Sequence, residues 1–413
     1  MKIAIVGSGI SGNSLAYTLS KEHDITLFEK NNRLGGHSHT HEIISQGKKI
    51  NVDTGFIVFN KKTYPLFTKL LDELNVHYEK SDMSFSVFSK DRNFEYNGTT
   101  LNTLFSQRKN IFNYKFIKMI YEIIKFNKVA LTLLSTKTEI SLEIFLNKNN
   151  FSNYFCKNYI LPMGSAIWSS NINSMLKFPA VFFIKFFNNH GMLNIDDRPQ
   201  WLTVTNGSKE YVEKLTSSIK KDIKLNCPVT TVKRNKDSVE IVHSDGTEKF
   251  DYIFFACHSN EALKLISDPS PREKEILLSI PYSKNEVTLH TDESIMPKNK
   301  LTWAAWNYNI DTTDDMPIAL TYNMNILQNL KTEETILVTL NDNGNINPKK
   351  VLKKITYEHP LFSLKSVEAQ KNYGIISGVN RTGFAGAYWG NGFHEDGINS
   401  AYNAIKYFKE AIK

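Results

Sequence analysis

Residues 1–39, MKIAIVGSGISGNSLAYTLSKEHDITLFEKNNRLGGHSH, decide the fold of this 413-residue chain. The β-branched, apolar run from Lys2 to Val6 ends at a glycine and predicts a short buried strand. A helix is expected from Ile10 to Leu19, and DITLFE, residues 24–29, predicts a second strand. Together these elements form a βαβ unit.

Three glycines, Gly7, Gly9 and Gly12, form a G-x-G-x-x-G pattern between the first strand and the helix. The first permits a tight turn, the second lets a pyrophosphate approach because it has no Cβ, and the third lets helix and strand pack closely. Ile10 and Ser11 supply the first amides of the helix, whose N-terminus attracts phosphate. The pattern therefore predicts a dinucleotide site.

An acidic residue, Glu29, closes the second predicted strand, 22 residues after Gly7. A carboxylate at this point can accept hydrogen bonds from the adenosine ribose hydroxyls and would repel a 2′-phosphate. NADP is therefore disfavoured, and NAD and FAD remain. A glycine turn with a surface glutamate is the purely structural alternative.

A second glycine cluster follows in RLGGHSHTHE, residues 33–42. With it the chain resembles the flavin-containing amine oxidase and phytoene desaturase superfamily, in which an acidic residue and an R-x-G-G-(R/H) segment hold FAD. The cofactor-binding residues implied here are Glu29, Lys30, Arg33, Gly35, Gly36 and His37. An FAD with two phosphates benefits from a second backbone nest and a cation, which an NAD dehydrogenase does not need. The resemblance thus implies FAD, held noncovalently because no cysteine occupies the segment where covalent linkage is common in amine oxidases.

The resemblance extends to GFAGAYWGNGFHEDGINSA, residues 383–401, which is similar to the closing motif of the superfamily. In that motif a strand end leads into a helix whose first amides face the flavin pyrimidine, where the helix N-terminus stabilises negative charge. The resemblance implies cofactor contacts by Gly386, Glu395, Asp396, Gly397 and Ile398. Further contacts are implied for Thr54, Gly55, Phe56, Val229, Ala256 and Cys257.

Two segments, VDTGFIVFN (residues 52–60) and LPMGSAIWSS (residues 161–170), are more similar to one subgroup than to the whole superfamily. That subgroup consists of bacterial FAD-dependent proteins often encoded beside cyclopropane-fatty-acid-synthase-like methyltransferases. It implies a hydrophobic or lipid acyl substrate and a lipid methyltransferase as partner. We expect no nucleic-acid partner.

Aromatic and histidine side chains are the candidates for the chemistry. Amine oxidases place an aromatic residue just before the last helix, and this position holds Phe393, whose apolar ring suits a hydrocarbon better than an ammonium group. Candidate substrate contacts are Phe56, Trp168, Trp303, Trp306, Tyr322, Tyr388, Trp389 and Phe393, although aromatic residues most often pack in cores. Candidate catalytic residues are His190, His394 and Tyr64. The alternating His37, His39 and His41 do not converge on a tetrahedral ion, so no metal site is predicted.

The length of the chain exceeds what one hydrophobic core usually supports. We predict an α/β (α+β) protein with a discontinuous Rossmann-like FAD-binding domain, formed by residues 1–60, 200–275 and 365–413. An inserted, mixed α+β substrate domain comprises residues 61–199 and 276–364. Its first part is expected to be helical because of NYKFIKMIYEIIKFNK (residues 113–128) and FPAVFFIKFFNN (residues 178–189).

The formal net charge of +8 favours anionic partners such as phospholipid head groups, or reflects solvated lysines. Residues 108–128 combine lysines with apolar residues at helical spacing and could lie on an anionic membrane, unless they form a domain helix with a solvated basic face. Three cysteines without metal or redox spacing suit a reducing cytoplasm. No transmembrane helix is expected. We therefore predict a cytoplasmic protein with peripheral contact to the inner face of the membrane.

The predicted function is removal of hydride from a hydrophobic substrate, as in desaturation of a modified or unsaturated fatty acyl chain. One alternative is oxidation of a small amine with oxygen as acceptor. Another is a redox-neutral flavin isomerase, or a flavoprotein that assists a lipid methyltransferase.

Overall fold

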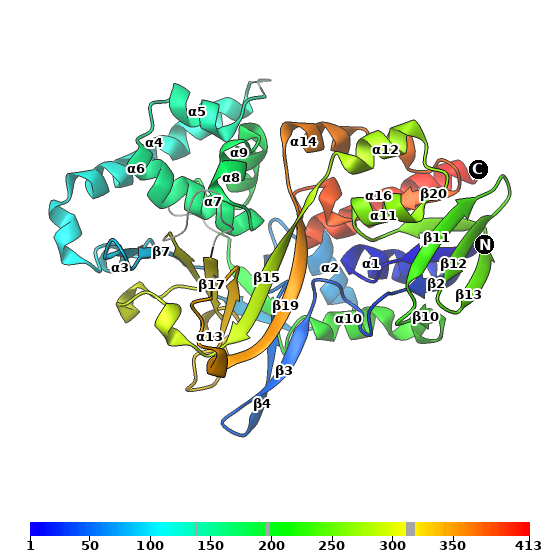
Figure 1. The fold of residues 1–413 in the computed structure, drawn as a ribbon, viewed down its shortest axis with the longest axis horizontal. Helices are drawn as coiled ribbons and strands as arrows, with labels where there is room; N and C mark the ends of the chain where they lie inside the picture. Colours follow the sequence, from blue (N-terminus) through cyan, green and yellow to red (C-terminus); the bar gives the residue numbers. More distant parts are fainter. Residues whose placement is uncertain (137–138, 195–198, 311–318, 343) are drawn as a thin grey trace.

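The computed structural model describes residues 1–136, 139–194, 199–310, 319–342 and 344–413. Figure 1 shows a parallel sheet with its helices at the right and a lobe of helices at the left, above a second sheet. Two long strands, β15 (Tyr282–His290) and β19 (Val351–Pro360), run between the two parts. The division of the chain into the two predicted domains remains a prediction.

The five-stranded parallel sheet has the order β10-β2-β1-β14-β20. Its strands come from both ends and the middle of the chain: β1 (Lys2–Val6), β2 (Asp24–Phe28), β10 (Ile223–Lys224), β14 (Tyr252–Phe255) and β20 (Thr382–Phe384). With α1 (Ile10–Leu19) between β1 and β2, the predicted βαβ unit and the α/β fold class are confirmed. The second strand ends one residue before Glu29.

Both faces of this sheet are covered because its strands are apolar on both sides. On one face, α1 packs against the C-terminal helix α16 (His394–Ala411), with Leu15, Ala404 and Phe408 in a common core. The other face carries the antiparallel sheet β11 (Val229–Arg234), β12 (Val239–His243) and β13 (Gly246–Phe250). The remaining helices of this part are α10 (Lys209–Thr216), α11 (Ser259–Leu265), α12 (Pro271–Leu278), α14 (Leu364–Lys371) and α15 (Tyr373–Ile376).

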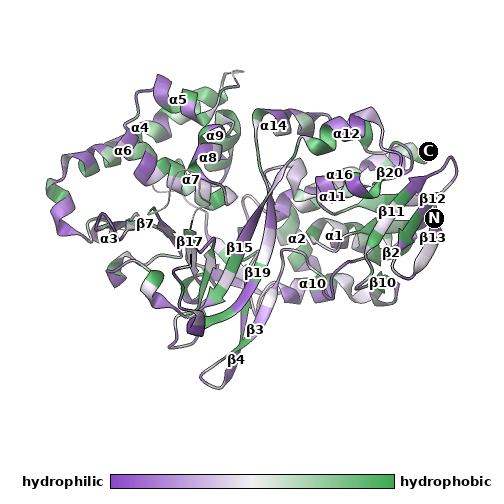
Figure 2. Ribbon diagram, viewed as in Figure 1, coloured by the Kyte–Doolittle hydropathy of each residue, from purple (hydrophilic) through white to green (hydrophobic). Residues whose placement is uncertain are grey.

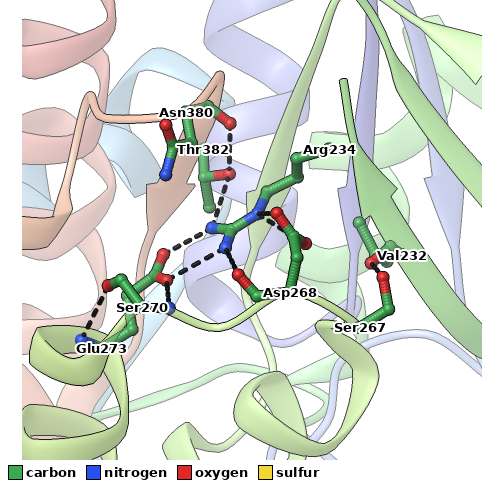
Figure 3. A network of polar contacts seen from close by, with 8 residues as sticks. All are labelled: Val232, Arg234, Ser267, Asp268, Ser270, Glu273, Asn380 and Thr382. Carbon is green, nitrogen blue, oxygen red and sulfur yellow. Dashed lines mark hydrogen bonds and ion pairs between the residues drawn. The ribbon is translucent and has the colours of Figure 1, made fainter. Parts of the chain in front are cut away.

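A buried ion pair joins the small antiparallel sheet to α12. Arg234, at the end of β11, forms two hydrogen bonds to Glu273 and also bonds the side chain and carbonyl of Asp268 (Figure 3). The side chains of Arg234 and Glu273 are 1% and 3% exposed. Burial raises the pKa of Glu273, but the bonds from Arg234 and Ser270 outweigh it and leave the pKa below its usual value.

The second sheet has seven strands in the order β19-β15-β18-β17-β16-β7-β8. Besides β15 and β19 these are β18 (Leu337–Leu340), β17 (Ala319–Asn323), β16 (Trp306–Asn309), β7 (Phe85–Ser89) and β8 (Phe94–Asn97). Among the described strand pairs of this seven-stranded sheet, only β16–β7 is parallel. Two smaller sheets complete the fold. One is the hairpin β3 (Thr40–Ser45) and β4 (Lys48–Asp53), and the other contains β5 (Val58–Asn60), β9 (Trp201–Val204) and β6 (Tyr78–Ser81) and packs against α2 and α10.

The helical lobe packs on the seven-stranded sheet through one large aromatic core. Its main helices are α4 (Tyr114–Leu134) and α9 (Ala180–Asn189), as the apolar spacing of both segments predicts. The others are α3 (Leu101–Leu104), α5 (Leu142–Lys148), α6 (Asn153–Phe155), α7 (Leu161–Trp168) and α8 (Ile172–Leu176). Outside the lobe lie α2 (Pro65–Glu73), which packs on α16, and α13 (Met324–Leu327). Short 3₁₀ helices are η1 (Arg108–Phe112), η3 (Ser217–Asp222), η4 (Glu293–Ile295), η5 (Lys300–Thr302), η6 (Pro348–Lys350) and η7 (Ala387–Trp389), and a π-helical segment, η2 (Cys156–Ile160), joins α6 to α7.

Candidate active site

The three glycines of the first loop have three different environments. Gly7 has φ +103°, and a Cβ there would lie 2.8 Å from the Ala256 carbonyl oxygen. A Cβ on Gly12 would lie 1.8 Å from the carbonyl oxygen of Gly7, whereas a Cβ on Gly9 would meet no atom within 4 Å. Gly7 and Gly12 are thus required by the fold itself. Gly9 instead leaves room beside the N-terminus of α1, where an anion binds well.

The carboxylate of Glu29 is buried and held by its neighbours. One oxygen accepts hydrogen bonds from the Ser8 amide (3.0 Å) and hydroxyl (2.6 Å), and the other from the Asn31 amide (2.9 Å) and side chain (2.7 Å). Because a carboxylate offers about four acceptor sites, a ribose hydroxyl would take the place of the Ser8 hydroxyl or the Asn31 side chain. The amide of Cys227 donates to the Glu29 carbonyl (2.9 Å), which brings Val229 to this end.

The second glycine cluster lies against the first. The Gly35 amide donates to the Ser8 carbonyl (2.9 Å), and a Cβ on Gly36 would lie 3.0 Å from the Cα of Gly9. Arg33 donates to the Gly36 carbonyl (2.8 Å), and no carboxylate pairs with it among the described residues. Burial lowers its pKa. Because only carbonyl oxygens bond Arg33, its positive charge is not neutralised and can pair with an anionic ligand at Gly9.

His37 points to a missing hydrogen-bond partner at the same place. Its Nε2 is buried and has no partner in the part of the chain that the structure describes. Burial lowers its pKa well below the usual range, so the ring is neutral and keeps one N–H to donate. A buried polar atom without a hydrogen-bond partner, such as this Nε2, destabilises the folded protein unless a bound group supplies the partner. In contrast, Lys30 is 61% exposed and pairs with Glu261 (2.6 Å), away from the loop.

The N-terminus of α16 meets that of α1. The Ser11 hydroxyl donates to the Gly397 carbonyl (2.9 Å), and a Cβ on Gly397 would lie 2.6 Å from Ile10. Ile398 is fully buried behind it. Gly386 donates its amide to Ser400 (2.8 Å). The structure therefore brings the first and last predicted cofactor segments together.

The segment of Thr54, Gly55 and Phe56 runs beside the second glycine cluster. The Phe56 amide donates to the His37 carbonyl (2.9 Å), and a Cβ on Gly55 would lie 2.2 Å from that oxygen. Thr54 donates its amide to the His39 carbonyl (3.1 Å). Ala256 and Cys257 follow β14 against Gly7, and burial raises the pKa of the Cys257 thiol.

The two carboxylates at the start of α16 are helix caps. Glu395 accepts the amides of Leu66 and Phe67 (both 2.9 Å), the first turn of α2. Asp396 accepts the amide of Phe393 (3.0 Å) in its own helix. Burial raises the pKa of Glu395 and raises that of Asp396 to about 6. Neither side chain is therefore free for a cofactor, although the amides of this turn are close to α1.

Comparison with known proteins agrees with this arrangement. The family model described as flavin containing amine oxidoreductase matches residues 10–345. The chain belongs to this family. Comparison with curated proteins finds no significant match. The protein is thus an FAD-dependent oxidoreductase, and the cradle at Gly9, the Arg33 cation and the unpartnered His37 nitrogen fit the FAD diphosphate.

Solved structures with the same fold share little sequence with this member of the flavin family. One is a putative protoporphyrinogen oxidase from Exiguobacterium sp. 255-15, with TM-score 0.72, 15% identity and coverage of 100% of this chain and 98% of that one. A variant of putrescine oxidase has TM-score 0.71, 15% identity and 99% coverage of both chains. The CLA-producing fatty acid isomerase from P. acnes has TM-score 0.70, 14% identity and 98% coverage of both.

Four of the predicted substrate contacts share the core of the helical lobe: Trp168, Trp306, Tyr322 and Phe393. Phe393 caps α16 and stacks on Phe186 of α9 (4.9 Å between ring centres). The other candidates lie elsewhere. Trp303 donates to the Pro297 carbonyl (2.9 Å) under Lys300, while Tyr388 and Trp389 pack with Tyr373 beside the parallel sheet. Phe56 stacks on His394 (3.5 Å).

The candidate catalytic residues fall into two groups. His190 ends α9, and its ring lies 6.3 Å from that of Tyr64 and 6.2 Å from that of Phe393. Its Nδ1 lies 3.0 Å from the Phe186 carbonyl, and burial lowers its pKa to about 4. Burial also raises the pKa of Tyr64. His394 instead has its Nε2 2.9 Å from both Ser38 and Tyr211, and burial lowers its pKa to about 3.

Sequence reasoning missed a ring cluster beside the second glycine loop. Tyr357 and His359 on β19 lie 4.9 and 5.2 Å from the His37 ring, and His258, after β14, lies 6.4 Å away. Burial lowers the pKa of His359 to about 4. The alternation of Tyr357 and His359 on one strand was the available signal.

The spacing of the cysteines also did not indicate that Cys227 Sγ lies 3.3 Å from Nδ1 of His243.

Proposed function

We propose that this FAD-dependent oxidoreductase removes hydride from a carbon atom of a hydrophobic substrate, an unsaturated or otherwise modified fatty acyl chain of a membrane lipid. The observation that carries the proposal is the apolar setting of Phe393. This ring caps the N-terminus of α16, stacks on Phe186, and belongs to the same large hydrophobic cluster as Trp306 and Tyr322. Such walls bind a hydrocarbon by excluding water from it.

The carboxylates near this position support a neutral substrate over an ammonium group. Glu395 accepts the amides of Leu66 and Phe67, just after Tyr64, and Asp396 follows it in the first turn of α16, so both lie close to Tyr64. Each already accepts backbone amides as a cap, and burial favours the uncharged form of each. An amine would need a free carboxylate or a tyrosine hydroxyl where the chain has Phe393.

Bound FAD supplies the acceptor for the hydride. The chain supplies the base. With Nδ1–H donated to the Phe186 carbonyl, the neutral His190 ring keeps the lone pair on Nε2 and can take the proton from the neighbouring carbon. His394 is less suited because Ser38 and Tyr211 already occupy its Nε2.

The test is anaerobic mixing of the purified holoprotein with phospholipid vesicles or with small amines, while the visible flavin absorbance is followed. Bleaching by lipids bearing unsaturated or cyclopropane chains, with a new double bond in the recovered lipid, supports the proposal. Bleaching by amines alone, with peroxide formed in air, would show an amine oxidase. Movement of a double bond without bleaching would show an isomerase. A methyltransferase partner and a cytoplasmic location remain predictions.

His190→Gln is the matched variant for the base. It keeps a side chain that can bond the Phe186 carbonyl but has no group that takes up a proton. We expect flavin content to be unchanged and flavin reduction by the lipid to slow about 10²- to 10⁴-fold, the usual contribution of a general base. His394→Gln should affect binding and stability more than the reduction rate.

A further inference from the structure

The outer face of the helical lobe carries apolar side chains that the fold leaves uncovered. On α4 these are Tyr114, Ile117, Tyr121, Ile124 and Leu131, which are 77%, 42%, 66%, 40% and 45% exposed. The first four recur every three or four residues and Leu131 follows two turns later, so the five form one stripe along the helix. Leu101, Ile111 and Phe112, which precede α4, are 76%, 48% and 91% exposed. We call these eight residues the α4 surface.

The opposite face of α4 is an ordinary core face, so the stripe is not a by-product of a poorly packed helix. Phe116, Met119 and Phe126 are at most 1% exposed and join the aromatic core of the lobe. With 100° per residue, this face and the stripe lie nearly opposite each other. A soluble helix normally has one apolar face. Figure 2 shows hydrophobic and hydrophilic residues interleaved along α4.

The exposed charged residues of the segment that carries the α4 surface are all basic. Arg108, Lys109, Lys115, Lys118 and Lys128 are exposed. The only acidic residue between positions 101 and 134 is Glu122, which is 2% exposed and bonds the Ser152 amide (2.9 Å) on the core side. Among the described residues no carboxylate pairs with Lys115, Lys118 or Lys128.

We propose that the α4 surface is a docking site for an anionic lipid bilayer. Exposed aromatic and aliphatic side chains enter the head-group region, and flanking lysines pair with lipid phosphates. Tyr114 and Tyr121 combine an apolar ring with a polar tip, which suits this boundary. No helix among the described residues is long and apolar enough to cross a membrane, so α4 lies in the plane of the bilayer.

The charge pattern disfavours the other occupants of such a stripe. In a symmetric dimer the same patch meets itself, so the basic residues of two copies would face one another. A nucleic acid would satisfy the lysines but would leave Phe112 and Leu131 in water. An anionic bilayer satisfies both kinds of side chain at once.

The α4 surface also has a direct relation to the proposed substrate site. The buried face of α4 packs on α9, whose last turn carries Phe186 and whose C-cap is His190. Docking would therefore place one helical layer between the lipid and the candidate base. This relation rests on the proposed function, whereas docking itself does not.

The experiment is flotation of the holoprotein with vesicles of phosphatidylglycerol and phosphatidylcholine, compared with vesicles of phosphatidylcholine alone. We expect binding to the anionic vesicles that weakens with added salt. Tyr114→Ser with Lys118→Glu should lower the partition coefficient at least about 30-fold, because it reverses one charge and removes an apolar anchor. Lys274→Glu with Leu278→Ser, an exposed lysine and an exposed apolar residue on α12, is the matched control and should bind as the wild type does.

Flavin content and thermal unfolding show whether each variant is folded. A milder second variant is Lys115→Gln with Lys118→Gln, whose partition coefficient for anionic vesicles should fall about 10- to 30-fold. Equal binding to both vesicle types, equal losses in the test and control pairs, or unchanged binding in both test variants would overturn the proposal. So would dimerisation through this surface without vesicle binding. Flotation without flavin reduction by lipid would refute the proposed function and leave the docking site intact.

Discussion

Gly9 and Gly12 offer a way to separate what the FAD site requires from what the fold requires. Gly9 has φ −67°, which any residue adopts, and its Cβ would meet no protein atom within 4 Å. In Gly9→Ala the apoprotein should therefore gain about 0.4–1 kcal/mol of stability from the stiffer unfolded chain. The new methyl group occupies the place assigned to the diphosphate. Overpacking of this contact should reduce the binding free energy of FAD by about 1–3 kcal/mol, which corresponds to a roughly 5- to 150-fold higher Kd.

Gly12→Ala is the matched control, because its Cβ would lie 1.8 Å from the Gly7 carbonyl oxygen. This variant should lose stability with or without FAD, by about 1–3 kcal/mol or more. The assays are urea unfolding of each apoprotein and a titration with FAD followed by quenching of flavin fluorescence. If Gly9→Ala binds FAD as the wild type does, the phosphate does not lie at Gly9. If its apoprotein is as unstable as that of Gly12→Ala, the fold itself requires Gly9 and the separation fails.

Three further predictions concern stability. Arg234→Met leaves the buried Glu273 carboxylate unpaired and should cost about 3–5 kcal/mol in urea unfolding, most of which a second change, Glu273→Gln, should restore. His290 is fully buried and burial lowers its pKa from 6.5 to about 4, so the unfolded chain binds its proton first and stability falls by about 3 kcal/mol as the pH drops through this range. His290→Gln should lack that part of the pH dependence, and an unchanged profile would refute the assignment. Glu395→Ala should lower the unfolding free energy by about 1 kcal/mol through the lost cap, whereas equal stability would mean that water replaces it.

The part of the fold that sequence predicts well is local. The βαβ unit follows from a run of five residues, three glycines and one helix, and the structure reproduces its bounds within one residue. The helices α4 and α9 follow from apolar spacing in the same way. In each case the decisive interactions lie within one element or between neighbours in the chain. Hydrophobic periodicity reports these directly.

Long-range pairings leave no such trace. The register of β15 with β19 joins residues about 70 positions apart, from Tyr282 with Pro360 to His290 with Val351. It brings Tyr357 and His359 to His37. Their alternation puts both rings on one face of β19, but no local pattern indicates that this face meets His37. The buried pair of Arg234 and Glu273 is hidden for the same reason, since each residue alone looks like a solvated surface charge.

The position of Glu395 at the start of a helix can be recognised from the sequence, but the residues that it binds cannot. Its place in the first turn of α16 predicts an interaction with the helix dipole. In the structure its side chain reaches α2 and binds the amides of Leu66 and Phe67, just after Tyr64 at the N-terminus of that helix. Phe393 begins α16 and His190 ends α9.

Three helix ends thus meet at the proposed substrate position, and the Glu395 carboxylate ties two of them together. A helix end holds a side chain at a fixed angle only if its orphan amides are satisfied. The acid therefore acts as a positioning residue. Its loss should shift Tyr64 relative to Phe393 and slow substrate oxidation, while the glycine loop that binds FAD, which it does not touch, keeps its affinity.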